Sequence, residues 1–255
     1  MAAPPKTILN TYQALLTTFT DFLVVAIHTI LYERALYPQD TFLLTRAYNF
    51  PVRQNRHPVV CKWVIDSVAA IQAHLLKGAV KRVVFVIYSR RQEVLERFLF
   101  DVSRFPTIPE RERFTQFAGT QPTVGDDGEQ FRISKVDVEE QLRSTIRKLA
   151  YCGGKLKSLP DGCTYTIAVE IKDKTEPPVG VRHAFKILRL NPNNLQHPQP
   201  WVPSEPSLQT GDKSGSKNVG KDLGGAKTVP VRSVETGEFI FESWIEEGKA
   251  KRNYT

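Results

Sequence analysis

One segment of the sequence has the residue types of a phosphate-binding loop. Residues 215–222 read Gly-Ser-Lys-Asn-Val-Gly-Lys-Asp and match the first seven positions of that pattern. Asp222 occupies the position where a Ser or Thr must ligate magnesium, and its carboxylate would repel the phosphates. No buried strand precedes the segment and no periodic helix follows it. We therefore interpret the match as low-complexity sequence, and a nucleotide-binding enzyme is only a remote alternative.

Cysteine and histidine side chains could supply a nucleophile or a set of metal ligands. The three cysteines, Cys61, Cys152 and Cys163, are scattered, and the five histidines show no HxxxH spacing. A Cys–His pair is compatible with the sequence, because the two partners need not be adjacent along the chain. We expect the cysteines to be small buried residues in a reducing compartment. The sequence thus predicts no catalytic residue, no metal and no other cofactor.

The basic residues give the chain a net charge of +8, from 35 Lys and Arg against 27 Asp and Glu. Arg143 and Arg147 lie one helical turn apart and point the same way, either as a docking surface or as a solvated face. Lys81, Arg82 and Arg90-Arg91 flank a predicted strand, and we expect them to be solubilising ends. No basic motif interleaved with aromatic residues is present, so a DNA-binding domain is a weakly supported alternative.

Hydrophobic periodicity predicts three helices that are separated by strands. The first covers about residues 7–37 and ends at Pro38, the second runs from His57-Pro58 to Gly78, and the third begins at Ser134. Residues 39–56 are expected to be an irregular or short-stranded connection. Strands are predicted at about 83–88, 95–102, 163–171, 181–190, 229–234 and 239–245. Three helices beside such strands indicate an α+β domain.

Two segments lack periodicity. Residues 103–131 form a predicted mobile loop, and residues 202–227 are rich in Ser, Gly and Lys and are expected to be disordered. The most apolar run, Phe22–Ile27, is much shorter than the ~20 residues of a membrane-spanning helix. No signal peptide is evident at the N-terminus. We expect a soluble intracellular protein whose C-terminal apolar segment is attached by a flexible tether.

Trp63 lies about 100° around the second helix from the centre of its apolar face. A large aromatic side chain in that position can anchor a partner peptide. It can equally be a half-buried part of the core, and helical spacing alone does not decide between the two.

Several short strings occur in a specific order and spacing along the chain. They are Phe22–Tyr32 with Tyr37-Pro38, Tyr48–Val52, His57-Pro58, Val83–Ile87, Glu96–Asp101, Val138–Arg143, Gly162–Thr166, Val229–Arg232 and Ile245–Glu247. Taken together, these strings resemble the HORMA-domain family, and within it the accessory, non-catalytic subunits of translesion DNA polymerase zeta. The resemblance covers about residues 7–102, 133–190 and 228–247. Each string is weak by itself, and their order and spacing make the resemblance specific.

The resemblance implies a non-enzymatic adaptor with three main helices packed on a mixed, mainly antiparallel sheet. Its C-terminal segment would be a safety belt that locks a partner peptide against the sheet. We expect a single domain over residues 1–255, with a core at 7–176 and a belt from about 177 to 255. Both 103–131 and 202–227 are longer than the family leads us to expect.

The resemblance also implies the partners. They are a peptide of the catalytic subunit of polymerase zeta, other translesion polymerases or scaffold proteins, and a second HORMA domain, all in the nucleus. No membrane is expected, and contact with DNA would be indirect. A spindle-checkpoint or meiotic HORMA adaptor that binds other peptides is the alternative.

Individual residues receive roles from the same resemblance. Trp63 falls where the family has an aromatic residue that contacts the peptide, and Arg143, with Arg147 beside it, falls on the helix that family members use to pair. We assign the remaining peptide-binding positions to the sheet and the belt: Tyr165, Ile167, Val169, Trp201 and Val229.

Overall fold

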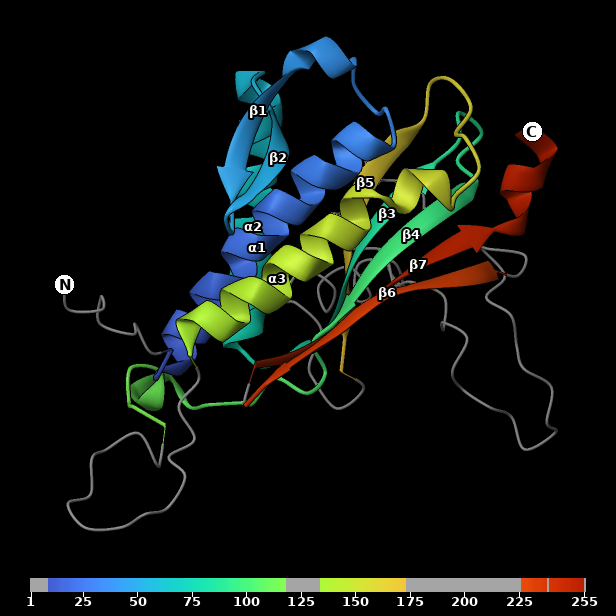
Figure 1. The fold of residues 1–255 in the computed structure, drawn as a ribbon. Coiled ribbons are helices and arrows are strands. Elements are labelled where there is room, and N and C mark those ends of the chain that lie inside the picture. Colours follow the sequence, from blue (N-terminus) through green and yellow to red (C-terminus); the bar gives the residue numbers. More distant parts are fainter. Residues whose placement is uncertain (1–8, 118–133, 173–225, 238, 255) are drawn as a thin grey trace, which may run out of the picture.

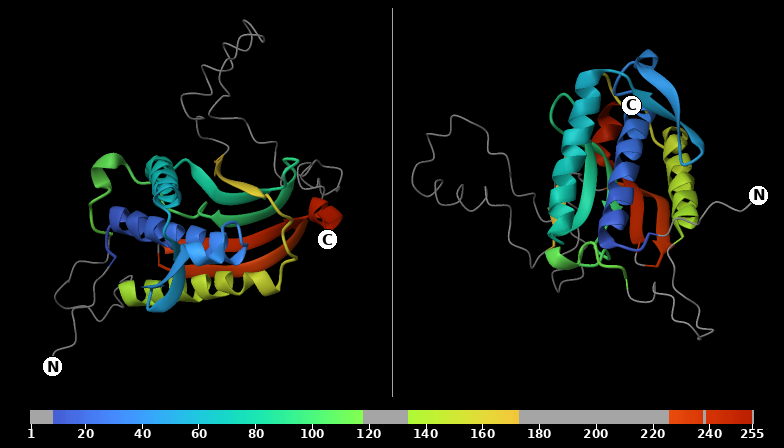
Figure 2. Two further views of the ribbon diagram at one scale, coloured as in Figure 1. Left: turned by 90° about the horizontal axis from the view of Figure 1, so that it is seen from above. Right: turned by 90° about the vertical axis from the view of Figure 1, so that its left-hand side faces the viewer.

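The computed structural model describes residues 9–117, 134–172, 226–237 and 239–254 (Figure 1). Three helices cover one face of a five-stranded sheet, and Figure 2 shows α1 between α2 and α3 in the helical layer. The helices are α1 (Tyr12–Glu33), α2 (Pro58–Leu76) and α3 (Lys135–Ala150). The sheet has the order β5-β3-β4-β7-β6, formed by β3 (Val80–Tyr88), β4 (Val94–Asp101), β5 (Thr164–Ile171), β6 (Ala226–Thr236) and β7 (Phe239–Gly248). This confirms the α+β class, although every pairing between described strands is antiparallel rather than mixed.

Helix α1 is shorter than its hydrophobic pattern predicted. The Thr11 side chain caps its first turn by accepting a hydrogen bond from the Ala14 N–H at 3.2 Å. At the other end Ala35 adopts φ +50°, and the N–H groups of Ala35 and Leu36 donate to the carbonyls of Tyr32 and Leu31. This pattern is a Schellman motif, so main-chain geometry ends the helix before Pro38 is reached.

Helices α1 and α2 are both long and apolar enough to cross a membrane by length and composition alone. In this fold α1 is the central core helix, with Leu15, Leu16, Phe19 and Leu23 all fully buried. Because α1 lies over the sheet between two other helices, its hydrophobicity is explained by packing within the domain. Helix α2 buries only one face, which the structure confirms as the predicted set Val60, Val64, Val68, Ile71 and Leu75.

Residues 42–55 form a hairpin where the sequence suggested an irregular or short-stranded connection. Strand β1 (Phe42–Ala47) pairs with β2 (Phe50–Asn55), and the turn residues Tyr48 and Asn49 have φ of +51° and +54°. Two consecutive left-handed residues are the mark of a type I′ turn, whose twist matches that of the two strands. The hairpin packs beside α1 at the edge of the helical layer (Figure 1).

The sheet is buried on both faces along β3, as its continuous apolar run predicted. On the helix side, Phe85, Phe98 and Phe100 join the main core, while Val84, Val86 and Leu99 form a second cluster on the other side. Arg82 corrects one prediction, because it is buried and not a solubilising end. It donates to Asp101 at 2.7 Å and to Glu170 at 3.0 Å, so the neighbouring strands satisfy its charge.

The first part of the predicted mobile loop, residues 103–117, packs against the body of the domain. Phe105 is buried beside Phe19, and the N–H of Phe117 donates to the Asn10 carbonyl. The segment contains only one 3-10 turn, Glu110–Glu112, which agrees with its lack of periodicity. The remainder of the loop, 118–131, lies outside the described residues.

The C-terminal hairpin attaches at the edge of β4. Strand β7 pairs with β4, and β6 pairs with β7 at the outer edge, where Pro230 is tolerated because an edge strand has unpaired positions. Strand β6 begins at Ala226, so the last two residues of the expected disordered insertion, 226–227, belong to a strand. The rest of that insertion and the strand predicted at 181–190 lie outside the described residues.

Candidate functional site

The outer edge of β5 is the main feature of the candidate site. In the described part of the chain β5 pairs only with β3, from Val80↔Ile171 to Tyr88↔Thr164, and its other edge carries no strand. The next described strand after β5 is β6, which lies at the opposite edge of the sheet. Such an edge has main-chain donors and acceptors that an extended peptide can satisfy.

An aromatic cluster lies beside the start of β5. The ring of Trp63, from α2, meets the ring of Tyr165 edge to face, with centroids 5.1 Å apart and an interplanar angle of 82°. Tyr165 also stacks on Phe85 at 5.3 Å and shares a 2.6 Å hydrogen bond with the hydroxyl of Tyr37. Trp63 is half-buried, which leaves part of its ring for a ligand.

Burial sets the protonation of this cluster. Burial raises the pKa of Tyr165, and the hydrogen bond with Tyr37 raises it further. The phenol is therefore neutral at physiological pH and acts as a hydrogen-bonding group within an apolar surface. The cluster has no charge of its own to offer a partner, so its contribution to binding is contact area and hydrogen bonding.

The structure brings four of the predicted peptide-binding residues together. Tyr165, Ile167 and Val169 alternate along β5 and are all half-buried against the core on the helix side of the sheet, and Tyr165 contacts Trp63. Val229 is different: it lies in β6, paired with Ile245, at the opposite edge of the sheet. The apolar pattern of that segment did reveal a strand, but which edge the strand joins depends on pairing with β7. Trp201 lies outside the described residues.

Arg143 and Arg147 lie where the sequence placed them, one turn apart on α3. Arg143 is partly exposed and pairs with Glu140 at 3.3 Å, and Arg147 is exposed. The core face of α3 packs on α1 and β6 through Val138, Leu142, Ile146 and Leu149, all confirmed as buried. Both arginines belong to α3, and Figure 2 shows α3 separated by α1 from α2, the helix whose Trp63 contacts β5.

Two of the cysteines, Cys152 and Cys163, lack the activation that a nucleophile requires. Burial raises the pKa of the Cys152 thiol to about 12, and burial together with the charge of Glu96 raises that of Cys163. In the described ranges no cluster of three or more His, Cys, Asp and Glu side chains is arranged to hold a metal ion. The loop-like segment 215–222 lies outside them.

A buried ion network near the C-terminus was missed by sequence reasoning. Glu96 is fully buried and accepts two hydrogen bonds from Arg34, at 2.7 and 2.8 Å, and one from Lys251. Lys251 also donates to the Lys157 carbonyl at 2.5 Å and lies 3.4 Å from Glu247. The sequence did contain an indication of this network, because Glu96 lies on the same side of β4 as Phe98 and Phe100, the side that faces the core. A carboxylate on the core side of a strand requires a buried cation to compensate its charge.

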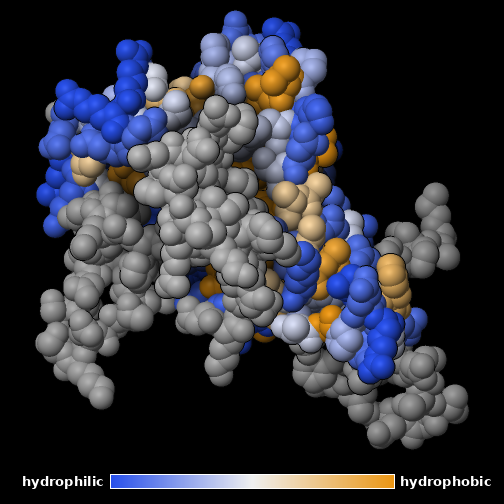
Figure 3. All heavy atoms as spheres, turned by 180° about the vertical axis from the view of Figure 1, so that it is seen from behind, coloured by the Kyte–Doolittle hydropathy of each residue, from blue (hydrophilic) through white to orange (hydrophobic). Residues whose placement is uncertain are grey.

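The outer surface of helix α2 exposes apolar side chains. Helix α2 lies behind α1 in Figure 1, and the view from behind in Figure 3 shows hydrophobic residues exposed among hydrophilic ones. Val59 and Ile65 of α2 are 69% and 58% exposed, on either side of the helix from its core face. Trp63 lies on the flank of α2 that contacts Tyr165 of β5, whereas Ile65 lies on the opposite flank.

Comparison with known proteins identifies the family. A sequence profile of the HORMA domain matches residues 16–192, more than half of the chain. The chain therefore belongs to the HORMA-domain family. It is similar to the DNA polymerase zeta processivity subunit of Schizosaccharomyces pombe, with 28% identity over 228 residues that cover 89% of this chain and 90% of that protein. It is also similar to the mitotic spindle assembly checkpoint protein MAD2B of Danio rerio, with 31% identity over 173 residues, or 68% and 73% of the two chains.

Solved structures agree on the fold. A chain of the mitotic checkpoint complex superimposes with a TM-score of 0.58 at 18% identity, covering 91% of this chain and 97% of that one. HTP-2 of C. elegans, solved with a HIM-3 closure motif, superimposes with a TM-score of 0.58 at 12% identity. The match covers 97% of this chain and 98% of that one. At these identities the likeness establishes the architecture, and the site residues must be argued from this chain alone.

Proposed function

We propose that this chain is a non-enzymatic adaptor of translesion DNA synthesis. It binds an extended peptide of the catalytic subunit of DNA polymerase zeta and bridges that subunit to other translesion polymerases or scaffold proteins in the nucleus. The observation that carries the proposal is the outer edge of β5 beside Trp63 and Tyr165, which pairs with no other strand among the described residues. The polymerase is inferred from the similarity to the fission-yeast processivity subunit, which spans 89% of this chain.

The binding mode follows from the chemistry of that edge. A peptide added alongside β5 gains main-chain hydrogen bonds, and its side chains alternate toward and away from the helical layer. One that points toward the helices meets the rings of Trp63 and Tyr165. A proline suits this position, since it packs well on aromatic rings and lacks an N–H that would need a partner. The C-terminal segment from about residue 177 to 255 would act as the belt that closes over the peptide, and its part up to residue 225 lies outside the described residues.

Peptides tiled across the polymerase zeta catalytic subunit test the proposal. Fluorescence anisotropy with the full-length chain should identify a tight-binding segment. Trp63→Ala should lower the affinity for this segment by about 30-fold or more, because a central buried aromatic side chain typically contributes about 2 kcal/mol or more to an interface. Ile65→Ala, on the opposite flank of the same helix, is the matched control and should leave affinity unchanged. Absence of binding by every peptide would refute the assignment.

A second contact, with another HORMA domain, is proposed at Arg143 and Arg147 of α3. Sedimentation of the full-length chain would detect pairing with itself or with a related domain. Arg143→Ala should abolish the paired species while leaving the circular dichroism spectrum unchanged. Lys148→Ala, an exposed cation on another side of the same helix, should still pair. If Arg143→Ala pairs as well as wild type, the interface lies elsewhere.

A checkpoint or meiotic adaptor is the second candidate, and the 31% identity to a protein named for the mitotic checkpoint favours considering it. That role would use the same edge of β5 with different peptides. Affinity capture with the full-length chain separates the two. Recovery of the polymerase zeta catalytic subunit, lost with Trp63→Ala, supports the translesion role, whereas recovery of checkpoint or meiotic proteins in its place supports the alternative.

A further inference from the structure

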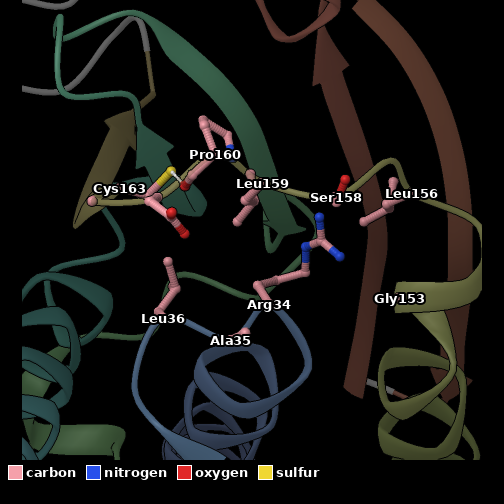
Figure 4. Close-up of a pocket in the computed structure, with 11 residues that line it drawn as sticks. Arg34, Ala35, Leu36, Gly153, Leu156, Ser158, Leu159, Pro160 and Cys163 are labelled. Carbon is pink, nitrogen blue, oxygen red and sulfur yellow. Dashed lines mark hydrogen bonds between the residues drawn. The ribbon is translucent and has the colours of Figure 1, made fainter. Parts of the chain in front are cut away.

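A cavity of about 420 Å³ lies at the end of the sheet where β5 begins. Its walls are the residues that follow α1, Arg34 to Leu36, and the loop 156–163 that leads into β5. Figure 4 shows Leu36 pointing from the end of α1 toward the loop that carries Pro160 and Cys163, with the Arg34 guanidinium in the same space. A volume of this size is within the range of small-ligand sites and exceeds that of any single side chain.

The cavity is continuous with the β5 edge. Leu36 and Cys163 line it, and the next residue after Leu36, Tyr37, bonds to Tyr165 at 2.6 Å. The aromatic cluster therefore begins where the cavity ends. A peptide that extends along β5 past Thr164 would pass beside Cys163, which lines this cavity. We propose that the cavity holds a bulky, uncharged side chain of the partner peptide, located just beyond the stretch that pairs with β5.

The cavity is held open by interactions that do not depend on a ligand. The Lys157 carbonyl accepts hydrogen bonds from both Arg34, at 2.6 Å, and Lys251, at 2.5 Å, which fix the start of the loop. Near its end, Gly162 has φ +74°, and a Cβ there would lie 2.0 Å from Nε of Arg90. The Cys163 thiol donates to the Pro160 carbonyl at 3.1 Å. A preformed pocket binds without the cost of ordering its walls.

The charges around the cavity define the side chain that it accepts. Arg34 is already neutralised by its two hydrogen bonds to Glu96, so its charge needs no counterion from a ligand. Asp161 lies exposed at the rim and would repel an acidic residue. The loop adds main-chain polar groups, and Leu36, Leu159 and Pro160 add apolar surface. A large neutral side chain that can also form hydrogen bonds with the polar groups of the lining matches this cavity best.

This inference rests on the proposed function, and its test separates the two. The probe is the tightest-binding peptide of the polymerase zeta set, together with versions shortened stepwise from each end. Cys163→Phe fills the cavity, and Cys163→Ala is the matched control. With the wild type and Cys163→Ala, removal of the anchoring residue should weaken binding about tenfold or more. Cys163→Phe should bind the full-length peptide as weakly as the wild type binds the peptide without its anchoring residue. Shortening the peptide should then cause no further loss of affinity for this variant.

Alkylation of the wild-type protein gives a second readout if Cys163→Phe does not fold. Saturating peptide should slow modification of Cys163 at least about fivefold, whereas that of Cys61, half-buried on the other flank of α2 from Trp63, should not change. If Cys163 is modified at the same rate with and without peptide while Trp63→Ala abolishes binding, the cavity takes no part and only the β5 edge binds. If no peptide binds, the cavity proposal fails together with the proposed function.

Discussion

Replacing Lys251 by methionine tests whether buried ion pairs hold the C-terminal end of the chain on the domain. Lys251 belongs to a 3-10 helix, Lys249–Tyr254, that follows β7, and its side chain is fully buried. Its ammonium contacts Glu96, Glu247 and the Lys157 carbonyl. Methionine keeps a long unbranched side chain without the charge, so the substitution isolates electrostatics from packing.

The expected cost follows from what each former partner retains. Loss of one partner of a buried pair costs about 3–5 kcal/mol, mainly because the other charge is left uncompensated. Glu96 would still accept two hydrogen bonds from Arg34, at 2.7 and 2.8 Å. Glu247 would keep the 3.3 Å bond from the Lys157 N–H but lose its cation. We therefore expect a loss of about 3 kcal/mol, the low end of the range, or a Tm lower by roughly 6–12 °C.

The positions of the four charges in this network predict how a double variant should differ in stability from Lys251→Met. Arg34 and Glu96 belong to the body of the domain, whereas Glu247 and Lys251 both belong to the C-terminal segment, so each side is neutral by itself. Adding Glu247→Gln to Lys251→Met restores neutrality and should recover about half of the lost stability. Glu96→Gln should be the most damaging single change, because it leaves Arg34 and Lys251 facing each other without the carboxylate between them.

Thermal and urea unfolding of the full-length variants, followed by circular dichroism at pH 7, measure these differences. Lys249→Met removes an exposed charge from the same 3-10 helix and should change stability by no more than about 0.5 kcal/mol. The reasoning is refuted if Lys251→Met costs less than about 1 kcal/mol. It also fails if the double variant is less stable than Lys251→Met, because charge balance would then not govern the network.

Three further predictions concern the core, a turn and pH. Leu142→Ala, at a fully buried position of α3, should lower stability by about 3 kcal/mol in urea unfolding, and a cost below 1 kcal/mol would show that α3 packs loosely. Gly162→Ala should lower the Tm, because its φ of +74° is a conformation that an alanine adopts only with strain. Gly154→Ala, which has no positive φ and open space around it, should leave the Tm unchanged; equal effects would contradict the strain argument. Burial lowers the pKa of His28 in the folded protein below its ordinary value of 6.5. As the pH falls, the unfolded chain therefore binds a proton at this histidine before the folded protein does. The contribution of His28 to stability is complete above about pH 6.5 and is lost as the pH falls below it. His28→Gln should lose less stability than wild type between pH 7 and 5, with a residual slope from His74, whose pKa burial also lowers; identical profiles would exclude His28.

Local patterns predicted most of the elements and their core faces. The periodic residues of α2 and α3 were all found buried, since a helix that packs on a core must present its apolar side chains every three to four residues. The continuous apolar run of β3 likewise identified a strand covered on both faces. The end of α1 was misplaced because an alanine adopts the left-handed conformation where glycine is the usual signal.

The candidate site was only partly accessible from the residues. Trp63 was ambiguous by helical spacing, and the resemblance to the HORMA family assigned its role. The structure adds the contact with Tyr165, across about a hundred positions of sequence, at 5.1 Å. Neither the cavity beside Leu36 nor the burial of Arg82 had a local signature, because both depend on which strands and loops become neighbours.

The sequence by itself determined the class of domain, the three helices with their buried faces, and the family to which the chain belongs. These properties depend on residues close together along the chain, where side-chain spacing maps directly onto one face of a helix or strand. Only the tertiary structure decided that Val229 lies at the opposite edge of the sheet from Tyr165, and that Lys251 reaches Glu96 from 155 positions away. The alternation of side chains along β4 indicates that Glu96 needs a buried cation, but strand order and tertiary packing decide which residue supplies it.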